Sequence, residues 1–301
     1  MKISVVIPVY KKSDMLMRHL RHNVPFLKDY EIIVVDDASD EDITTKIHAE
    51  FPQIHVYENG RNLGFAPSVN RGIREAQGDY IMLLNSDVKL MQPFTSSDFD
   101  VFEKDPALFA VSFMQKERDG SFIGKNRLFF EDGFPHHDIS DNLDKGLNGW
   151  AEGGSCIIRM QYLQELGGFL DIYAPFYWED NDLSYRAYSR GWYVLFDPRF
   201  IVEHHHESTV SAFYTKKQVR TIAYRNQLLF TWINITESSF FMAHLLLLPK
   251  HLLKAVIRWD MQFLKGCVAA LCMLPQVFGF RKNKKSHQVI SDSEVLTKIS
   301  S

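Results

Sequence analysis

Glu31-Ile-Ile-Val-Val35 carries a continuous apolar run that stops at the polar cluster Asp36-Asp37-Ala38-Ser39-Asp40. An uninterrupted run of β-branched residues predicts a parallel strand that is covered on both faces. The acids and serine after it are typical of a turn that starts a helix. The stretches 3–9 and 80–84 show the same change from apolar run to polar cluster. The sequence therefore predicts several buried strands that each end in polar residues.

Helical patterns separate these strands over the first ~110 residues, at 13–22, 43–50 and 68–76. Strands that alternate with helices indicate a doubly wound α/β sheet. Ligands bind such sheets beyond the carboxyl ends of the strands. We therefore expect residues 8–10, Asp36-Asp37 and Asn85-Ser86-Asp87 to share one edge of the sheet.

The rest of the chain divides into three parts. Residues 112–150 show no clear period and are expected to form strands and a long loop. Order returns with a strand ending at Ile158 and with helices at 161–166, 179–189 and 214–234, the last two separated by strands at 192–196 and 200–204. We assign 1–235 to one α/β domain, 236–285 to a helical extension and 286–301 to a disordered tail.

Composition excludes several classes of protein. The chain has 301 residues, a net charge of −3 and 46 % hydrophobic residues, so we expect a sizeable core and no nucleic-acid partner. Its three cysteines form no CxxC pair, which argues against a disulfide framework or a structural zinc site. The opening MKISVVIPVY is interpreted as a strand and not as a signal peptide. A reducing, cytoplasmic compartment is the default expectation.

Acidic residues supply the candidate chemistry. Asp87, at the end of a strand, suits Mg²⁺ or Mn²⁺ together with substrate phosphates, although a turn or a helix cap would explain it as well. In Asp36-Asp37, one acid could cap the next helix and the other could bind a base or ribose. Trp178-Glu-Asp-Asn-Asp182 places three acids at a helix start, beside an aromatic stretch that could shield one of them as a general base.

Two further patterns leave alternatives open. Arg186 lies four residues after Asp182, and this spacing suits an ion pair that holds the helix. In His204-His205-His206, the first and third histidines share one face of a strand, so the run could hold a metal ion or lie in an ordinary surface loop.

Taken together these stretches resemble the family 2 glycosyltransferases with the GT-A fold, as found in bacterial polysaccharide and lipopolysaccharide assembly, including rhamnosyltransferases. The resemblance covers about residues 1–235. The matching stretches, in chain order, are Ser4-Val-Val-Ile-Pro-Val-Tyr10, Val34-Val-Asp-Asp-Ala-Ser39, Asn62-Leu-Gly-Phe65 through Asn70, Gly78-Asp-Tyr80 with Leu83-Leu-Asn-Ser-Asp87, Gly153-Gly-Ser155, Gly167-Gly-Phe169, Trp178-Glu-Asp-Asn-Asp-Leu183 with Arg186, and Val202-Glu-His204 with Ser208.

The resemblance implies a nucleotide-sugar donor and a divalent cofactor, Mn²⁺ or Mg²⁺. It implies that Asp87 and His204 bind this ion and that Asn85 contributes to the donor site. The family often has Asp-x-Asp here, so Asn85 is a departure that implies weaker metal binding. The remaining donor-binding residues implied by the resemblance are Pro8, Tyr10, Asp36, Asp37, Asn62, Gly64 and Asn70.

On the acceptor side, the resemblance implies that Asp180 is the catalytic base, with Glu179 and Asp182 orienting the base or the acceptor. It implies that the acceptor is contacted by Gly153, Gly154, Ser155, Trp178 and Glu179. The implied activity is an inverting transfer of a sugar to a saccharide or lipid-linked acceptor. No Ser, Cys or Lys constellation suggests a covalent intermediate, which fits single displacement.

The segment 240–285 is apolar and basic, with Asp260 as its single acid. A transmembrane pair, interfacial helices and helices packed on the domain or on a second subunit are the three alternatives. The apolar runs 240–248 and 266–280 are shorter than the ~20 residues of a membrane span, so we favour amphipathic helices peripheral to the cytoplasmic face of a membrane.

Two other functions were weighed. A nucleotidyltransferase would need a Gly-rich basic loop after the first strand, where this chain has Pro-Val-Tyr-Lys-Lys. A non-catalytic nucleotide-sugar-binding or scaffold protein would be expected to lose the base or the metal ligands, yet Asp180, Asp87 and His204 are present. We therefore favour the enzyme.

Overall fold

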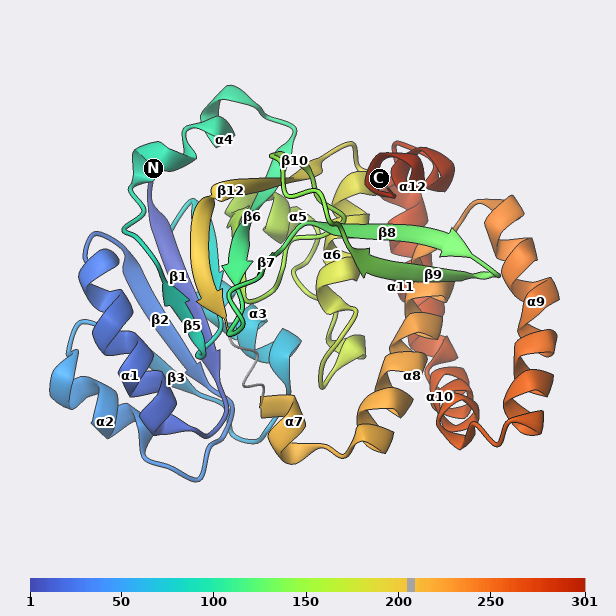
Figure 1. Cartoon of the computed structure of the whole chain (residues 1–301), viewed down its shortest axis with the longest axis horizontal. Coiled ribbons are helices and arrows are strands. Elements are labelled where there is room, and N and C mark those ends of the chain that lie inside the picture. Colours follow the sequence, from blue (N-terminus) through green and yellow to red (C-terminus); the bar gives the residue numbers. More distant parts are fainter. Residues whose placement is uncertain (205–208, 301) are drawn as a thin grey trace.

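The structure is a computed structural model, and it describes residues 1–204 and 209–300 (Figure 1). A central sheet in these residues runs in the order β10-β12-β6-β11-β4-β1-β2-β3, with β5 and β7 paired at its margin. Its first half is parallel and consists of β1 (Ile3–Val9), β2 (Glu31–Asp36), β3 (His55–Glu58) and β4 (Tyr80–Leu84). The prediction of an α/β sheet is confirmed.

The second half of the sheet is mixed, because β11 runs antiparallel to both β4 and β6 whereas β12 runs parallel to β6. Its strands are β5 (Val88–Leu90), β6 (Leu108–Lys116), β7 (Phe122–Ile123), β10 (Gly146–Leu147), β11 (Ser155–Arg159) and β12 (Tyr193–His204). The two strands expected at 192–196 and 200–204 are one strand, β12, with a register shift between Asp197 and Ile201.

Helices cover both faces of the parallel half. Ile33 and Val35 of β2 pack in a core with Val69, whereas Ile32 and Val34 pack in a second core with Leu16. Each of the four β2 side chains is at most 4 % exposed, which explains the continuous apolar run. The covering helices are α1 (Ser13–Asn23) and α2 (Ile43–Glu50) on one face and α3 (Phe65–Glu75) on the other.

The irregular region 112–150 contains a separate hairpin, β8 (Asn126–Glu131) and β9 (Phe134–Ile139), which reaches from the sheet toward α9 (Figure 1). The remaining helices are α4 (Val101–Lys104), α5 (Met160–Glu165), α6 (Glu179–Ser189), α7 (Thr209–Phe213), α8 (Lys216–Asn234), α9 (Ser238–Ile257), α10 (Met261–Cys272), α11 (Leu274–His287) and α12 (Asp292–Ile299). Short 3₁₀ turns occur at Val24–Phe26, Ser96–Phe99 and Asp171–Tyr173.

Helix α6 is fixed by a buried ion pair. Arg186 Nε donates to Asp182 Oδ2 at 2.7 Å, as the four-residue spacing predicts. The guanidinium also donates to the carbonyl oxygens of Leu166 and Gly168. Breaking such a pair leaves a buried charge uncompensated and costs about 3–5 kcal/mol. This network therefore sets where the N-terminus of α6, with its acids, lies.

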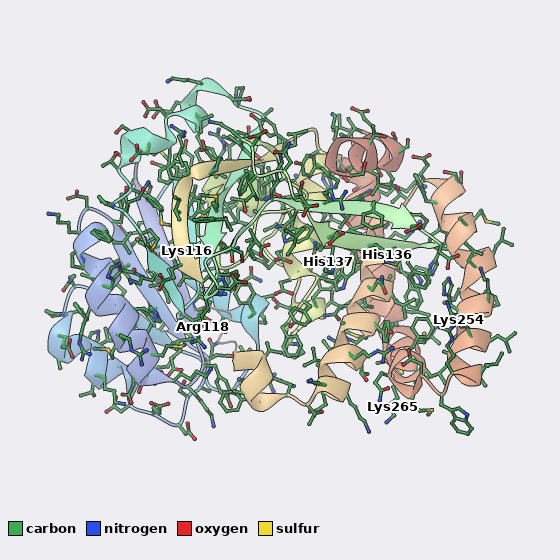
Figure 2. The ribbon with its side chains drawn as sticks, in the orientation of Figure 1. Lys116, Arg118, His136, His137, Lys254 and Lys265 are labelled. Atoms are coloured by element: carbon green, nitrogen blue, oxygen red, sulfur yellow. The ribbon has the colours of Figure 1, made fainter. Side chains whose placement is uncertain are left out.

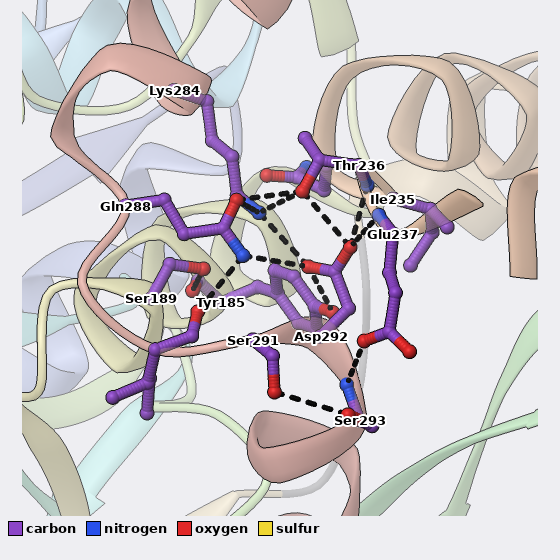
Figure 3. A network of polar contacts seen from close by, with 12 residues as sticks. Tyr185, Ser189, Ile235, Thr236, Glu237, Lys284, Gln288, Ser291, Asp292 and Ser293 are labelled. Carbon is purple, nitrogen blue, oxygen red and sulfur yellow. Dashed lines mark hydrogen bonds and ion pairs between the residues drawn. The ribbon is translucent and has the colours of Figure 1, made fainter. Parts of the chain in front are cut away.

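The structure differs from the expected disorder of 286–301, because α12 packs against α6 and β8. Figure 3 shows the polar network around Asp292, at the start of this helix. Asp292 is fully buried and accepts hydrogen bonds from the Tyr185 hydroxyl at 3.1 Å and from Lys284 Nζ at 2.9 Å. Its other oxygen accepts from the backbone N–H of Thr236 and of Glu237. The polar composition of this segment suggested a tail because the partner that neutralises its buried acid, Lys284, lies outside the segment, in α11.

Candidate active site

A cavity of about 750 Å³ lies at the carboxyl ends of β1, β2 and β4. Of the residues predicted from the sequence, Pro8, Tyr10, Asp37, Asn62, Gly64, Asn85, Asp87, Gly153, Gly154, Trp178, Glu179, Asp180 and His204 line it. Side chains from widely separated parts of the chain thus meet in one place, as the expectation for an open parallel sheet requires.

Asp37 organises the end of the cavity formed by the loop 59–64. Its carboxylate accepts hydrogen bonds from the backbone N–H of Leu63 and of Gly64 and from Asn59 Nδ2, each at 2.8 Å. Gly64 has φ of +93°, and a Cβ there would lie 2.8 Å from Pro175, so glycine is required. Asp37 therefore shapes the loop 59–64 as well as facing the cavity.

Asp36 lies outside the cavity and accepts hydrogen bonds from Ser39. Burial raises the pKa of this carboxyl. Neither acid caps the next helix, because Asp42 holds that position and accepts from the backbone N–H of Thr45. Asp36 thus supports the loop behind Asp37.

The predicted metal ligands face each other. His204 Nε2 lies 3.3 Å from Asp87 Oδ1, and His204 Nδ1 lies 2.8 Å from Gln115 Oε1. Adjacent ligands about 2.1 Å from an octahedral ion stand about 3.0 Å apart, so the pair fits a divalent ion after a small movement. Gln115 accepts the second ring N–H, as outer partners of metal-bound histidines do.

These two residues are too few to complete a coordination sphere. Among residues 1–204 and 209–300, no group of three His, Cys, Asp or Glu side chains could hold an ion alone. Phosphate oxygens of a bound donor would have to supply the remaining ligands. Asn85 lines the cavity but packs its amide against Gly154. His205, His206 and Ser208 lie outside the described residues.

The predicted base has the properties that general-base chemistry needs. Asp180 lies on the first turn of α6, and burial raises its pKa to about 6. The backbone N–H of Asn181 donates to Asp180 Oδ1 at 2.8 Å. A carboxyl with a pKa near 6 is ionised at neutral pH and is still basic enough to take a proton.

A second acid in the cavity, Glu152, was missed by the sequence analysis. Burial, together with the negative charge of Asp180, raises its pKa to about 7. Asn126 Nδ2 donates to Glu152 Oε1 at 2.6 Å. The only feature of the sequence that could have indicated Glu152 is its position just before Gly153-Gly154, which the resemblance implies to contact the acceptor.

Four predicted residues lie outside the cavity and have structural roles. Asn70 joins α3 to the turn that follows α5, because its amide nitrogen donates to the carbonyl of Phe169 and its oxygen accepts from Phe169 N–H. Asp182 holds Arg186, and Ser155 is fully buried in β11. With Asp36, these residues correct the predicted donor, acceptor and catalytic sets.

The architecture matches solved glycosyltransferase structures. The first 349 residues of S. aureus TarS, in complex with UDP-GlcNAc, superpose with a TM-score of 0.60 at 14 % identity, covering 100 % of this chain and 90 % of TarS 1–349. GalNAc-T7, crystallised with UDP, GalNAc and Mn²⁺, gives 0.59 at 16 % identity over 77 % of this chain and 48 % of that one. The chain therefore has the GT-A fold.

The chain belongs to glycosyl transferase family 2, because the model of that family matches residues 4–167, more than half of its length. It is accordingly a glycosyltransferase. YwdF of Bacillus subtilis, an uncharacterised glycosyltransferase, is 29 % identical over 197 residues, which cover 62 % of this chain and 68 % of YwdF.

Other relatives align over a shorter part. The poly(ribitol-phosphate) β-glucosyltransferase of Bacillus spizizenii is 38 % identical over 96 residues, 29 % of this chain and 15 % of the relative. An uncharacterised glycosyltransferase of Rickettsia conorii is 33 % identical over 118 residues, 38 % of this chain and 17 % of that relative. The chain thus spans only about a sixth of the length of these two proteins.

Proposed function

We propose that this chain transfers a sugar from a nucleotide-diphosphate sugar to an acceptor hydroxyl, with inversion at the anomeric carbon. The observation that carries the proposal is that the half-buried carboxylate of Asp180 and the Asp87–His204 pair line the same cavity. Such a displacement needs a base that takes the proton of the acceptor hydroxyl. It also needs residues that bind a metal ion next to the leaving diphosphate.

The reaction is a single displacement. Asp180 takes the proton of the acceptor hydroxyl while the acceptor oxygen bonds to the anomeric carbon. The bond between that carbon and the diphosphate oxygen breaks, and its electron pair leaves with the nucleotide diphosphate. A divalent ion, Mn²⁺ or Mg²⁺, bound by Asp87 and His204 would offset the negative charge on this leaving group. No lysine or cysteine lines the cavity in the described residues, which fits the absence of a covalent step.

A donor panel tests the proposal. Thermal unfolding would be followed with UDP, dTDP and GDP sugars, each with and without Mn²⁺. At a free concentration about 100 times its dissociation constant, a ligand stabilises the folded state by about 2.7 kcal/mol. We expect one base to give this stabilisation only with metal, and NMR of the product to show the inverted anomer. No shift with any donor, or a retained anomer, would refute the proposal.

We also propose that the enzyme works on a saccharide or lipid-linked acceptor at the cytoplasmic face of a membrane. Among the described helices, only α9 is long and apolar enough by itself to cross a membrane, with a mean hydropathy of 1.5. Helices α10 and α11 reach that length and hydropathy only together, and they are bent by 70° relative to each other. Several apolar side chains of α9 and the α9–α10 turn are more than half exposed, including Leu246, Ile257 and Trp259. This exposed surface supports contact with lipid.

The packing of α9 supports a peripheral position instead of a span. His244 lies between Trp232, whose Nε1 donates to it at 2.9 Å, and the carbonyl of Gly133 at the hairpin tip. His251 Nε2 lies 2.9 Å from the carbonyl oxygen of Asp132. A helix that held this polar hairpin while it crossed the bilayer would bury the hairpin in lipid, which is unfavourable. Flotation with vesicles that contain phosphatidylglycerol tests the association, and a protein that stays in the soluble fraction would refute it.

A further inference from the structure

One wall of the active-site cavity is aromatic and comes from the part of the chain without a sequence pattern. His137 of β9 lies between two tryptophans, with ring centroids 5.5 Å from Trp150 and 5.2 Å from Trp178. All three line the cavity, whereas the neighbouring His136, shown beside His137 in Figure 2, lines a second cavity. Burial lowers the pKa of His137, which keeps its ring neutral at physiological pH. The wall is therefore aromatic and uncharged.

Two residues that line the cavity also carry buried polar atoms that have no hydrogen-bond partner within the described residues. Glu179 and Asn181 line it and are 7 % and 5 % exposed. Among the described residues, neither Glu179 Oε2 nor Asn181 Nδ2 has a hydrogen-bond partner. Leaving such a buried group unpaired costs about 1–3 kcal/mol, so both atoms are suited to a ligand that brings hydroxyl groups.

Charge narrows the choice of ligand. Five carboxyl groups line this cavity, and besides those of Asp37 and Asp87 they belong to Glu152, Glu179 and Asp180. No lysine or arginine does so among the residues that the structure describes. Burial raises the pKa of Glu179 well above its ordinary value and that of Glu152 to about 7, so Asp180, with a pKa of about 6, is the main negative charge among the three at neutral pH. A phosphate on the acceptor would meet this charge without a cation, which is unfavourable. The donor diphosphate differs, because the Asp87–His204 pair can bring a metal ion to it.

We infer that the acceptor group in this cavity is an uncharged sugar residue, with one face on the His137–Trp150–Trp178 wall and its hydroxyls at Glu179 and Asn181. The inference rests on the proposed function. It distinguishes the acceptor of this chain from that of an enzyme that glycosylates a phosphate or a polyol phosphate. Any phosphate of a lipid-linked acceptor lies outside the cavity. Aromatic rings with a few buried polar groups are the usual surroundings of such a ligand.

Binding and transfer are measured separately. Saturation-transfer NMR without donor would compare octyl glycosides of neutral hexoses and 6-deoxyhexoses with ribitol 5-phosphate and farnesyl phosphate. The same compounds would then serve as acceptors with the donor found active. We expect at least one neutral glycoside, and neither phosphate compound, to bind and to be glycosylated. Asn181→Leu and Trp150→Leu should each raise the acceptor KM by about tenfold and leave the donor Kd unchanged.

Trp192→Leu is the matched control, because Trp192 stacks on Tyr162 with centroids 3.9 Å apart and does not line the cavity. An equal rise of KM in this variant would overturn the assignment, as would binding by either phosphate compound or by no glycoside at all. The two failures are distinguishable. Transfer to a phosphate acceptor would refute this inference alone, whereas glycoside binding without turnover of any donor would refute the proposed function alone.

Discussion

Replacing Asp180 by asparagine should remove catalysis and stabilise the fold at the same time. The substitution keeps the size of the side chain and leaves an oxygen that can accept from the Asn181 N–H. It removes the negative charge that the proposed mechanism uses to take the proton. General-base catalysis typically contributes about 10²–10⁴ in rate, so transfer should fall by that factor. Donor binding should be unchanged, because the substitution leaves the end of the cavity that Asp37 organises as it is.

The stability change follows from the pKa of Asp180, which is raised from 3.8 to about 6 in the folded protein. A carboxyl with a raised pKa binds its proton more tightly in the folded state than in the unfolded state. Stability is therefore greatest at low pH and falls as the pH rises from 3.8 to about 6. The full difference corresponds to about 3 kcal/mol. Because asparagine carries no charge, Asp180→Asn should be more stable than the parent at pH 7 by up to that amount.

Single-turnover transfer rates test the predicted loss of catalysis in Asp180→Asn. Urea unfolding at pH 4 and at pH 7 tests the predicted gain of stability. The stability gain should be present at pH 7 and nearly absent at pH 4. Asp182→Asn is the contrasting variant, since it leaves Arg186 without its partner and should be destabilised by about 3–5 kcal/mol. A variant at 180 that transfers sugar within threefold of the parent rate would show that the base is elsewhere. A destabilised variant at pH 7 would show that the carboxylate is held by more favourable contacts than those described.

His204→Ala should raise the Mn²⁺ concentration needed for half-maximal activity by at least tenfold, and an unchanged metal titration would refute its role as a ligand. Asp180→Asn should also lower the pKa of Glu152 below about 7, because the negative charge of Asp180 helps to raise it; an unchanged pKa of Glu152 in a carbon-13 NMR titration would contradict this coupling. Gly168→Ala should destabilise the fold by more than about 1 kcal/mol, because φ is +72° there and a Cβ would lie 2.5 Å from Asn70 Oδ1. Equal melting temperatures of parent and variant would show that the turn can relax.

Where the pattern of a strand is followed directly by the pattern of a turn, the sequence was sufficient to predict the structure. Residues 31–40 predicted both the buried strand and the polar edge at which Asp37 now lies. The resemblance to the family, and not the strand pattern, predicted Asp87 and His204 as ligands of one ion, and the pairing of β12 with β5 brings His204 next to Val88. The nearest approach of those two side chains, 3.3 Å, could not be read from the sequence, since β12 reaches that edge after a register shift.

Three kinds of residue could not be assigned from the sequence. His137 and Glu152 lie where no period exists, and only the pairing of β8 with β9 directs the first of them into the cavity. Asn70 and Asp182 belong to motifs that also contain cavity residues, yet their side chains point into the protein and hold turns. Helix α12 was missed because the partner that neutralises Asp292, Lys284, lies in a different helix. Tertiary contacts decide all of these positions.

The contact between Tyr185 and Asp292 spans 107 residues, and this separation has a consequence for biosynthesis. Chains are elongated at about 5–20 residues per second, so roughly 5–20 s pass between synthesis of α6 and synthesis of its partner. During that time the far end of the helix that carries Asp180 has no α12 to pack against. We therefore expect nascent chains to hold a nearly complete sheet while the catalytic helix is still exposed to proteases and chaperones.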